Sequence, residues 1–63
     1  MFLKLTLQNT QEPIYVNMDD IASFAPKKNG GTVLYEREFN TTIHVKEPCD
    51  LIFTWLRIGG QNT

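Results

Sequence analysis

Cysteine and histidine are almost missing from this sequence, with Cys49 and His44 the only residues of their kinds among 63. A lone cysteine cannot form an internal disulfide, and one cysteine with one histidine cannot supply the four ligands of a structural zinc site. We therefore expect no disulfide framework, no metal and no other cofactor. An unpaired cysteine is typical of a reducing compartment, where a buried thiol acts as a small hydrophobic side chain.

Long apolar runs are missing as well. No run exceeds three residues, the length of Leu51-Ile52-Phe53, whereas a membrane-spanning helix needs about 20. The first residues, Met1 to Lys4, do not have the basic-then-apolar order or the small-residue cleavage site of a secretion signal. We expect a cytosolic protein with no membrane partner.

The charged residues show no excess of one sign. Six basic and seven acidic residues give a formal net charge of -1. Proteins that bind nucleic acids usually carry a basic face that displaces counterions from phosphates. The charge balance therefore argues against nucleic acid as a partner without excluding it.

The chain is also short, and 63 residues make one domain at most. A domain of this size buries only about 60% of the surface that its unfolded chain exposes. Without a disulfide or a metal, stability has to come from an unusually well-packed monomer or from a second copy of the chain. We expect a homo-oligomer.

Apolar residues alternate with polar ones in several short segments, as in half-buried strands. The pattern predicts five strands, over residues 3–7, 14–17, 21–25, 32–36 and 42–46. Lys27-Lys28-Asn29-Gly30-Gly31 is the strongest turn signal, because Asn-Gly-Gly supplies the positive-φ positions of a hairpin. The predicted fold is α+β, with a small curved antiparallel sheet of four or five strands followed by one C-terminal helix.

The step Asn17-Met18-Asp19-Asp20, between the second and third predicted strands, is too short for a crossover and lacks the signal of a tight hairpin. It predicts a bent connection that turns the chain around a corner of the sheet. The adjacent carboxylates of Asp19 and Asp20 suggest a metal or acid–base pair. We favour a structural use, in which one aspartate binds its own backbone in an Asx-type turn.

The periodicity changes after the fifth predicted strand, where Glu47-Pro48-Cys49-Asp50 opens a helix that runs to about Ile58. Pro48 suits the first helical position, Asp50 suits the first turn, and Gly59 is a standard C-terminal stop. We therefore predict one β-rich domain with a C-terminal helix over residues 1–58, and a flexible tail over residues 59–63.

Apolar residues of the predicted helix cover an arc of roughly 200°, wider than the stripe of about 100° expected of a surface helix. One small sheet would leave part of this arc uncovered. We predict that Phe53, Trp55 and Leu56 contribute to self-association. In the alternative, the sheet curls around the helix and buries the whole arc.

Four segments carry a family resemblance: Leu3-Lys4-Leu5-Thr6, Tyr15-Val16-Asn17-Met18-Asp19-Asp20-Ile21, Gly31-Thr32-Val33-Leu34 and Ile43-His44-Val45-Lys46-Glu47. In order and spacing they resemble the FlbD-like (SwrD) small bacterial proteins associated with flagellar loci. The resemblance spans about residues 3–56 and rests mostly on structural positions. It implies the fold predicted above and a flagellum-associated role, and a small phage or mobile-element protein on the same scaffold is equally compatible.

The order of short strands and a following helix is also similar, more weakly, to LytTR-type DNA-binding domains. This second resemblance implies a nucleic-acid-binding regulator. Only Lys27, Lys28, Arg37 and Lys46 could contact phosphates, and four scattered cations make a weak binder.

Candidate contacts for a partner lie on the outward side of the predicted strands. Tyr15 points away from the face that Ile14 and Val16 define, and His44 alternates with Ile43 and Val45 on a face shared with Lys46. Exposed aromatic side chains near His44 would make an amphipathic recognition patch. Lys27 and Lys28 could attract an acidic partner, or they could serve only to keep the hairpin soluble.

A nucleophilic pair of Cys49 and His44 is conceivable, because Cys49 lies at a helix N-terminus where a thiolate is favoured. Glu47 and Pro48 separate the two residues, and no third orienting group is evident, so a buried structural thiol is the better interpretation. We expect no enzyme. The sequence favours a protein-interaction or regulatory module that binds a still unidentified protein as an oligomer, and the alternative is a nucleic-acid-binding regulator.

Overall fold

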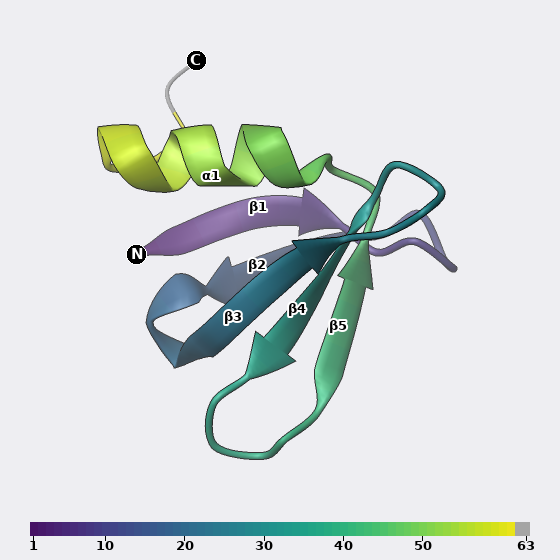
Figure 1. The fold of residues 1–63 in the computed structure, drawn as a ribbon, viewed down its shortest axis with the longest axis horizontal. Coiled ribbons are helices and arrows are strands. Elements are labelled where there is room, and N and C mark those ends of the chain that lie inside the picture. The colour runs from purple at the N-terminus through teal and green to yellow at the C-terminus, as the bar shows by residue number, and fades with distance from the viewer. Residues whose placement is uncertain (62–63) are drawn as a thin grey trace.

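The computed structural model describes residues 1–61, which form five strands, a short 3-10 helix and one α-helix (Figure 1). The strand bounds differ from the predicted ones by at most one residue at each end, so the alternation of apolar and polar residues located them correctly. The elements in chain order are β1 Phe2–Thr6, β2 Pro13–Asn17, η1 Met18–Asp20, β3 Ile21–Pro26, β4 Thr32–Glu36, β5 Thr42–Val45 and α1 Cys49–Ile58.

The strands form two antiparallel sheets, so the prediction of a single sheet is wrong, although the α+β class with a C-terminal helix is confirmed. One sheet pairs β1 with β2, and the other has the order β3-β4-β5. The division falls at η1, which redirects the chain between β2 and β3. In Figure 1, α1 runs above β1, and β3, β4 and β5 fan out below it.

The corner at η1 is closed by Asn17. Its Oδ1 accepts a hydrogen bond from the Asp19 amide at 3.1 Å, and the Met18 amide donates to the Met1 carbonyl at 2.8 Å. Asn17, rather than Asp19 or Asp20 as predicted, is therefore the Asx-type turn residue. The Asp19 carboxylate instead lies 3.4 Å from the amino terminus.

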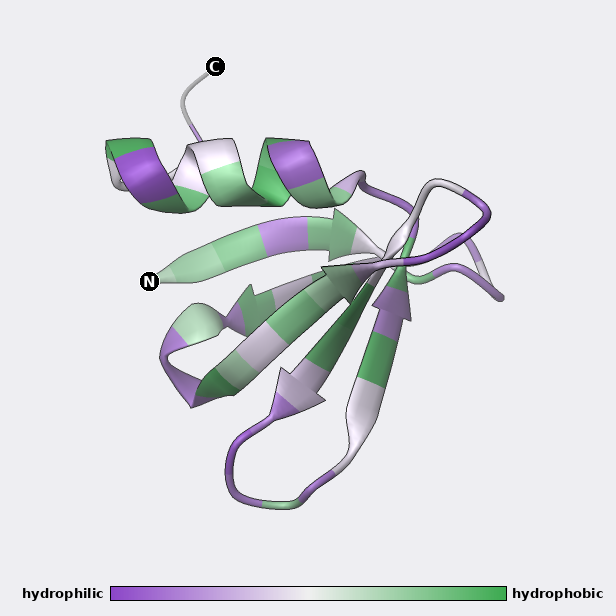
Figure 2. Cartoon of the chain, in the orientation of Figure 1, coloured by the Kyte–Doolittle hydropathy of each residue, from purple (hydrophilic) through white to green (hydrophobic). Residues whose placement is uncertain are grey.

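The core lies between the two sheets and the helix. Its fully buried members are Leu3 and Leu5 of β1, Leu34 of β4, Val45 of β5 and Ile52 of α1. Figure 2 shows the same alternation of apolar and polar residues along the strands. Burying each of these side chains contributes about 1.5–3 kcal/mol relative to leaving it in water, so β1 and α1 hold the two sheets together through apolar contact.

The helix begins at Cys49, one residue later than predicted, and Pro48 takes the N-cap position rather than the first helical position. It ends at Gly59, where the left-handed φ of 91° confirms the predicted stop. Gln61 follows, and its side-chain amide binds β1 by two hydrogen bonds of 2.7 Å, accepting from the Lys4 amide and donating to the Lys4 carbonyl. Residues 62 and 63 of the predicted tail lie outside the described part of the chain.

Candidate functional site

The two sheets meet where the end of β1 approaches the end of β5. Leu7 and Val45 form an isolated antiparallel bridge. Two hydrogen bonds flank it, from the Lys46 amide to the Thr6 carbonyl at 2.9 Å and from the Gln8 amide to the His44 carbonyl at 3.0 Å. Beyond this bridge the β1–β2 loop turns away from β5. We call this junction the seam.

A small pocket of about 280 Å³ opens at the seam. Leu7, Ile14 and Ile43 supply its apolar part, and both isoleucines are half-buried. The polar part consists of Gln8, Asn9, Thr10, Thr42 and His44. The volume lies at the lower end of the range for small-molecule sites, about 300–1,000 Å³, and suits one or two side chains of a partner.

A hydrogen-bonded group of side chains includes two residues that line the pocket, Gln8 and His44. The Lys27 Nζ lies 2.6 Å from Gln8 Oε1 and 2.7 Å from His44 Nδ1. An ammonium group donates but cannot accept, so Nδ1 is the acceptor in this contact. The Nε2 then faces Thr42 Oγ1 at 3.3 Å.

The β1–β2 loop adds a second lysine to this group. Lys46 Nζ donates to Gln11 Oε1 at 2.6 Å, and Gln11 Nε2 donates to the Gln8 carbonyl at 2.8 Å. Gln11 has a left-handed φ of 65°, a conformation that costs a residue with a Cβ about 1–2 kcal/mol. We name Gln8, Gln11, Lys27, His44 and Lys46 the seam cluster.

Both lysines of the seam cluster bind neutral amide oxygens. Among residues 1–61, the only pair of opposite charges within 4.0 Å joins the amino terminus to Asp19. The positive charges of Lys27 and Lys46 are therefore not neutralised by a carboxylate of residues 1–61. The cluster can donate hydrogen bonds to an anionic group of a partner.

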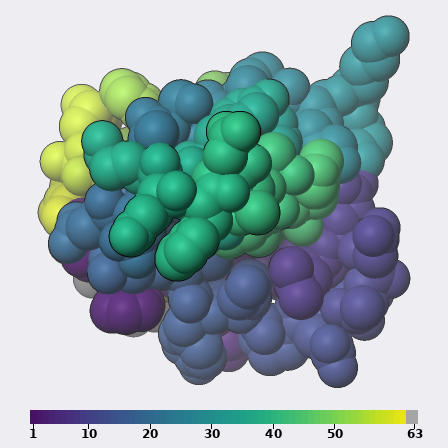
Figure 3. Space-filling view, turned by 90° about the horizontal axis from the view of Figure 1, so that it is seen from below, coloured from purple at the N-terminus to yellow at the C-terminus, as the bar shows by residue number. Residues whose placement is uncertain are grey.

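The β3–β4 turn places Lys27 in the cluster. The Lys27 amide donates to the Gly31 carbonyl at 2.8 Å, and Asn29 Oδ1 accepts from the Gly31 amide at 3.0 Å, which confirms the predicted hairpin. A Cβ on Gly31 would collide with the Val45 carbonyl, so only glycine lets the turn approach β5 this closely. Figure 3 shows this turn (teal) and the β1–β2 loop (violet-blue) on the same side of the molecule as β5.

The predicted contact residues divide into two places. Lys27, His44 and Lys46 come together in the seam cluster, and Lys28 lies exposed in the neighbouring turn. Tyr15 lies on β2 and pairs with Lys4 of β1, in the sheet that does not contain β5. It has 66% of its surface exposed, and among the described residues it makes no hydrogen bond to the cluster.

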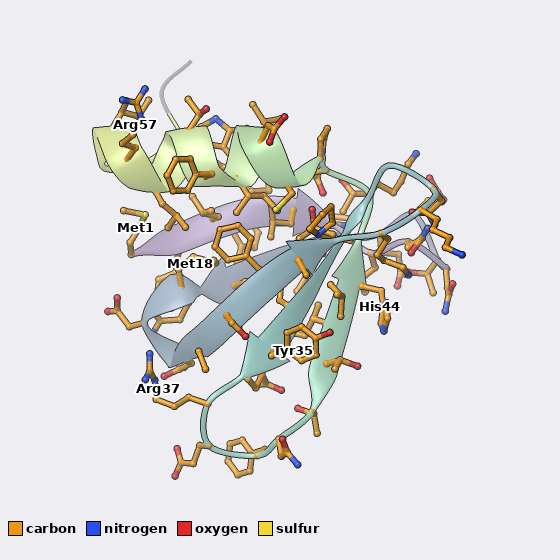
Figure 4. All side chains as sticks on the ribbon, viewed as in Figure 1. Met1, Met18, Tyr35, Arg37, His44 and Arg57 are labelled. Atoms are coloured by element: carbon orange, nitrogen blue, oxygen red, sulfur yellow. The ribbon has the colours of Figure 1, made fainter. Side chains whose placement is uncertain are left out.

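Tyr35 is the aromatic residue that shares a face with His44. Thr42 pairs with Tyr35 and His44 with Val33, so all four side chains lie on the outer face of β4 and β5. Figure 4 shows Tyr35 in front of this sheet and His44 at its margin. Alternation along β4 places Tyr35 on the same face as Val33, and the cross-strand register brings that face next to His44.

The helix residues predicted to self-associate differ in exposure. Trp55 and Leu56 are half-buried and pack against the core. Phe53 is 58% exposed, on one flank of the helix, while Leu51 and Ile58 are exposed on the other flank. Self-association stays a prediction, and among the three predicted residues Phe53 is the best placed to contribute.

The other candidates for chemistry form no constellation in the described chain. Cys49 is half-buried at the start of α1. Within residues 1–61, no three histidine, cysteine, aspartate or glutamate side chains are grouped so that they could hold a metal ion. In the same part of the chain, none of the helical structure has both the length and the apolar character needed to cross a membrane.

Comparison with known proteins gives no relative for this chain: no family model, no curated protein and no solved structure matches it. The resemblances to the FlbD-like and LytTR-type proteins therefore stay predictions.

Proposed function

We propose that this protein is a non-enzymatic interaction module that binds a partner protein at the seam. The observation that carries the proposal is the contact of Lys27 with both Gln8 and His44, beside a pocket with an apolar floor. A peptide segment offers the matching chemistry, because it combines aliphatic side chains with carboxylates and backbone hydrogen-bonding groups.

The size and lining of the pocket support a peptide rather than a small molecule. A volume of about 280 Å³ holds one or two side chains, and small-molecule sites generally bury most of a larger ligand. The hydrogen bonds of the seam cluster fix Lys27 and His44 before a partner arrives, which lowers the entropy lost on binding. The FlbD-like resemblance favours a regulatory role for such a module, in a flagellar or phage setting and in the cytosol.

A displayed library of random dodecapeptides, selected on the immobilised protein, tests this proposal. We expect the recovered peptides to compete with one another for one site, and we expect Lys27→Gln to weaken their binding. Lys4→Gln is the matched control, because Lys4 lies on the outer face of the other sheet. Failure to recover any peptide whose binding depends on the folded protein would contradict the proposed function.

Self-association is part of the same proposal and rests on the exposed flank of the helix. Phe53 exposes 58% of its surface in a domain that has little core of its own. We expect sedimentation equilibrium at micromolar concentration to give a mass above 7.3 kDa. Phe53→Ser should return the protein to a folded monomer, and a wild-type monomer under these conditions would refute this part of the proposal.

Nucleic-acid binding is the second candidate, and the position of three lysines favours it. Lys27, Lys28 and Lys46 lie around the seam, and Lys27 and Lys46 are unpaired with any carboxylate of the described chain. Three phosphate contacts would give a slope of about -2.7 in a plot of log affinity against log salt concentration. Titration of random duplex DNA at low salt checks this, and absence of binding there removes the candidate.

A further inference from the structure

We infer that the seam binds an acidic peptide in extended conformation, which adds to β5 as an extra strand beside Thr42 and His44. This inference rests on the proposed function and names the chemistry of the partner. Three features of the seam support it: the backbone of β5, the pocket and the charge of the seam cluster.

The pairing of β5 with β4 shows which backbone groups of β5 point to its free edge. Ile43 and Val45 exchange hydrogen bonds with β4, as the register with Leu34 and Thr32 and the bond from the Glu36 amide to the Thr41 carbonyl indicate. The backbone groups of Thr42 and His44 therefore point away from β4. The bond from the Gln8 amide to the His44 carbonyl confirms this direction.

The ladder between β1 and β5 stops after that bond. In a continued ladder the Gln8 carbonyl would accept from the His44 amide, but it accepts instead from Gln11 Nε2. Among residues 1–61, the His44 amide and the backbone groups of Thr42 have no hydrogen-bond partner. These are the groups that an added strand pairs with.

The pocket lies directly beside this edge, because Thr42, Ile43 and His44 are three of its lining residues. Side chains of an added strand alternate between the two faces of the sheet. Those on the core side would reach the apolar floor at Ile14 and Ile43. Those on the outer side would reach the face of His44 and Lys46, next to Lys27.

Charge decides between the two occupants that could pair with such an edge. A second copy of this chain, pairing β5 with β5, would bring two sets of Lys27 and Lys46 together without an intervening carboxylate. Like charges at such short range disfavour that arrangement. A segment with glutamate or aspartate at alternate positions meets both lysines, so the charge pattern selects an acidic partner.

The probe for this inference is a capped octapeptide of four Val-Glu repeats, titrated into the isotopically labelled protein at low salt. We expect the amide signals of Thr42 and His44 to shift, and hydrogen exchange at the His44 amide to slow. Lys27→Gln and Lys46→Gln should each weaken binding by about threefold, with Lys4→Gln unchanged. A peptide of Val-Lys repeats should bind at least tenfold more weakly.

N-methylation of the probe tests the added strand itself. Amides of alternate residues point to the same side of an extended peptide, so methylation of all valines or of all glutamates blocks one edge. We expect one of these two peptides to bind within about threefold of the unmodified probe. The other, and the peptide methylated at every residue, should bind at least tenfold more weakly.

Three results would overturn the inference: equal binding of all methylated peptides, equal binding of the Val-Lys peptide, or amide shifts confined to the helix. If peptides selected from the library bind the protein while one of these results is obtained, the proposed function survives and only the added strand is refuted. A wild-type dimer with its interface at Thr42–His44 would also overturn the inference, in favour of a second copy.

Discussion

The outward edges of β1 and β5 differ in whether their backbone groups are hydrogen-bonded. Along β1, the outward groups of Lys4 are bound by Gln61, and the Thr6 amide is bound by Glu47 Oε1 at 2.9 Å. Along β5, the corresponding groups of Thr42 and the His44 amide have no partner within the described chain. Side chains from the C-terminal part therefore close one edge and leave the other available.

The difference shows that side-chain hydrogen bonds can cover the backbone groups of a strand edge when no further strand pairs with it. An unpaired strand edge is a template for unwanted pairing, and one glutamine and one glutamate side chain cover the edge of β1 at Lys4 and Thr6. The free backbone groups of β5 lie beside the pocket and the lysines, where pairing can be selective. Three substitutions test this division, and the largest effect is expected where the closed edge meets the core.

Glu47→Ala should produce the largest loss of stability. The Glu47 carboxylate accepts from both the amide and the hydroxyl of Thr6, each at 2.9 Å in a partly buried position. Charge-assisted hydrogen bonds contribute about 1.5–3 kcal/mol, so we expect unfolding free energy to fall by about 3 kcal/mol in urea titration. The backbone carbonyl of Glu47 would still accept from Thr32 Oγ1, so the loss reports the carboxylate alone.

Glu38→Ala is the matched control, because Glu38 is exposed in the β4–β5 loop and makes no hydrogen bond in the described chain. Its effect should stay within about 0.5 kcal/mol. Equal losses for Glu38→Ala and Glu47→Ala would mean that the carboxylate does not close the β1 edge.

Gly31→Ala should have the second-largest effect, and it acts on the open edge. The new Cβ would press on the Val45 carbonyl, and overpacking of this kind costs about 1–3 kcal/mol. The β3–β4 turn would move away from β5 and carry Lys27 with it, so binding of the Val-Glu peptide should weaken along with stability. A folded variant with unchanged thermal midpoint and unchanged peptide affinity would show that the close approach is unimportant.

Gln61→Ala should have the smallest effect on stability, about 1 kcal/mol, because its two hydrogen bonds are exposed. Its more specific effect should appear in hydrogen exchange, where the Lys4 amide loses its acceptor and exchanges faster. Gln61→Glu separates the two bonds, since a carboxylate keeps the acceptor for the Lys4 amide and loses the donor to its carbonyl. Unchanged exchange at Lys4 in Gln61→Ala would indicate that the edge is not covered in solution.

The sequence was a good guide wherever a feature depends on neighbours along the chain. Alternation located all five strands, Asn29-Gly30-Gly31 located the hairpin, and Gly59 located the end of the helix. Period-2 patterns also predicted that His44 lies on the face away from Ile43 and Val45. These features follow from local backbone geometry, which short-range patterns encode directly.

Features that join distant segments were out of reach. Nothing in the sequence of residues 8–11 indicates that Gln8 and Gln11 accept hydrogen bonds from two lysines. Likewise, nothing in the sequence around Gln61 indicates that its side chain binds the backbone of Lys4. The division into two sheets was missed because a strand pattern says which face is buried but not which edge is paired. The candidate site was thus predicted in part, through Lys27, His44 and Lys46, while its pocket needed the packing of both sheets.

The closure of β1 by Gln61 also has a consequence for the order of events during translation. Gln61 lies 57 residues beyond Lys4, and Glu47 lies 41 residues beyond Thr6. At about 5–20 residues per second, β1 is synthesised seconds before either side chain that covers it. The strand β1 is therefore synthesised well before the side chains that cover it, and the nascent chain passes through a period in which the edge of β1 can be captured by chaperones or by other strands.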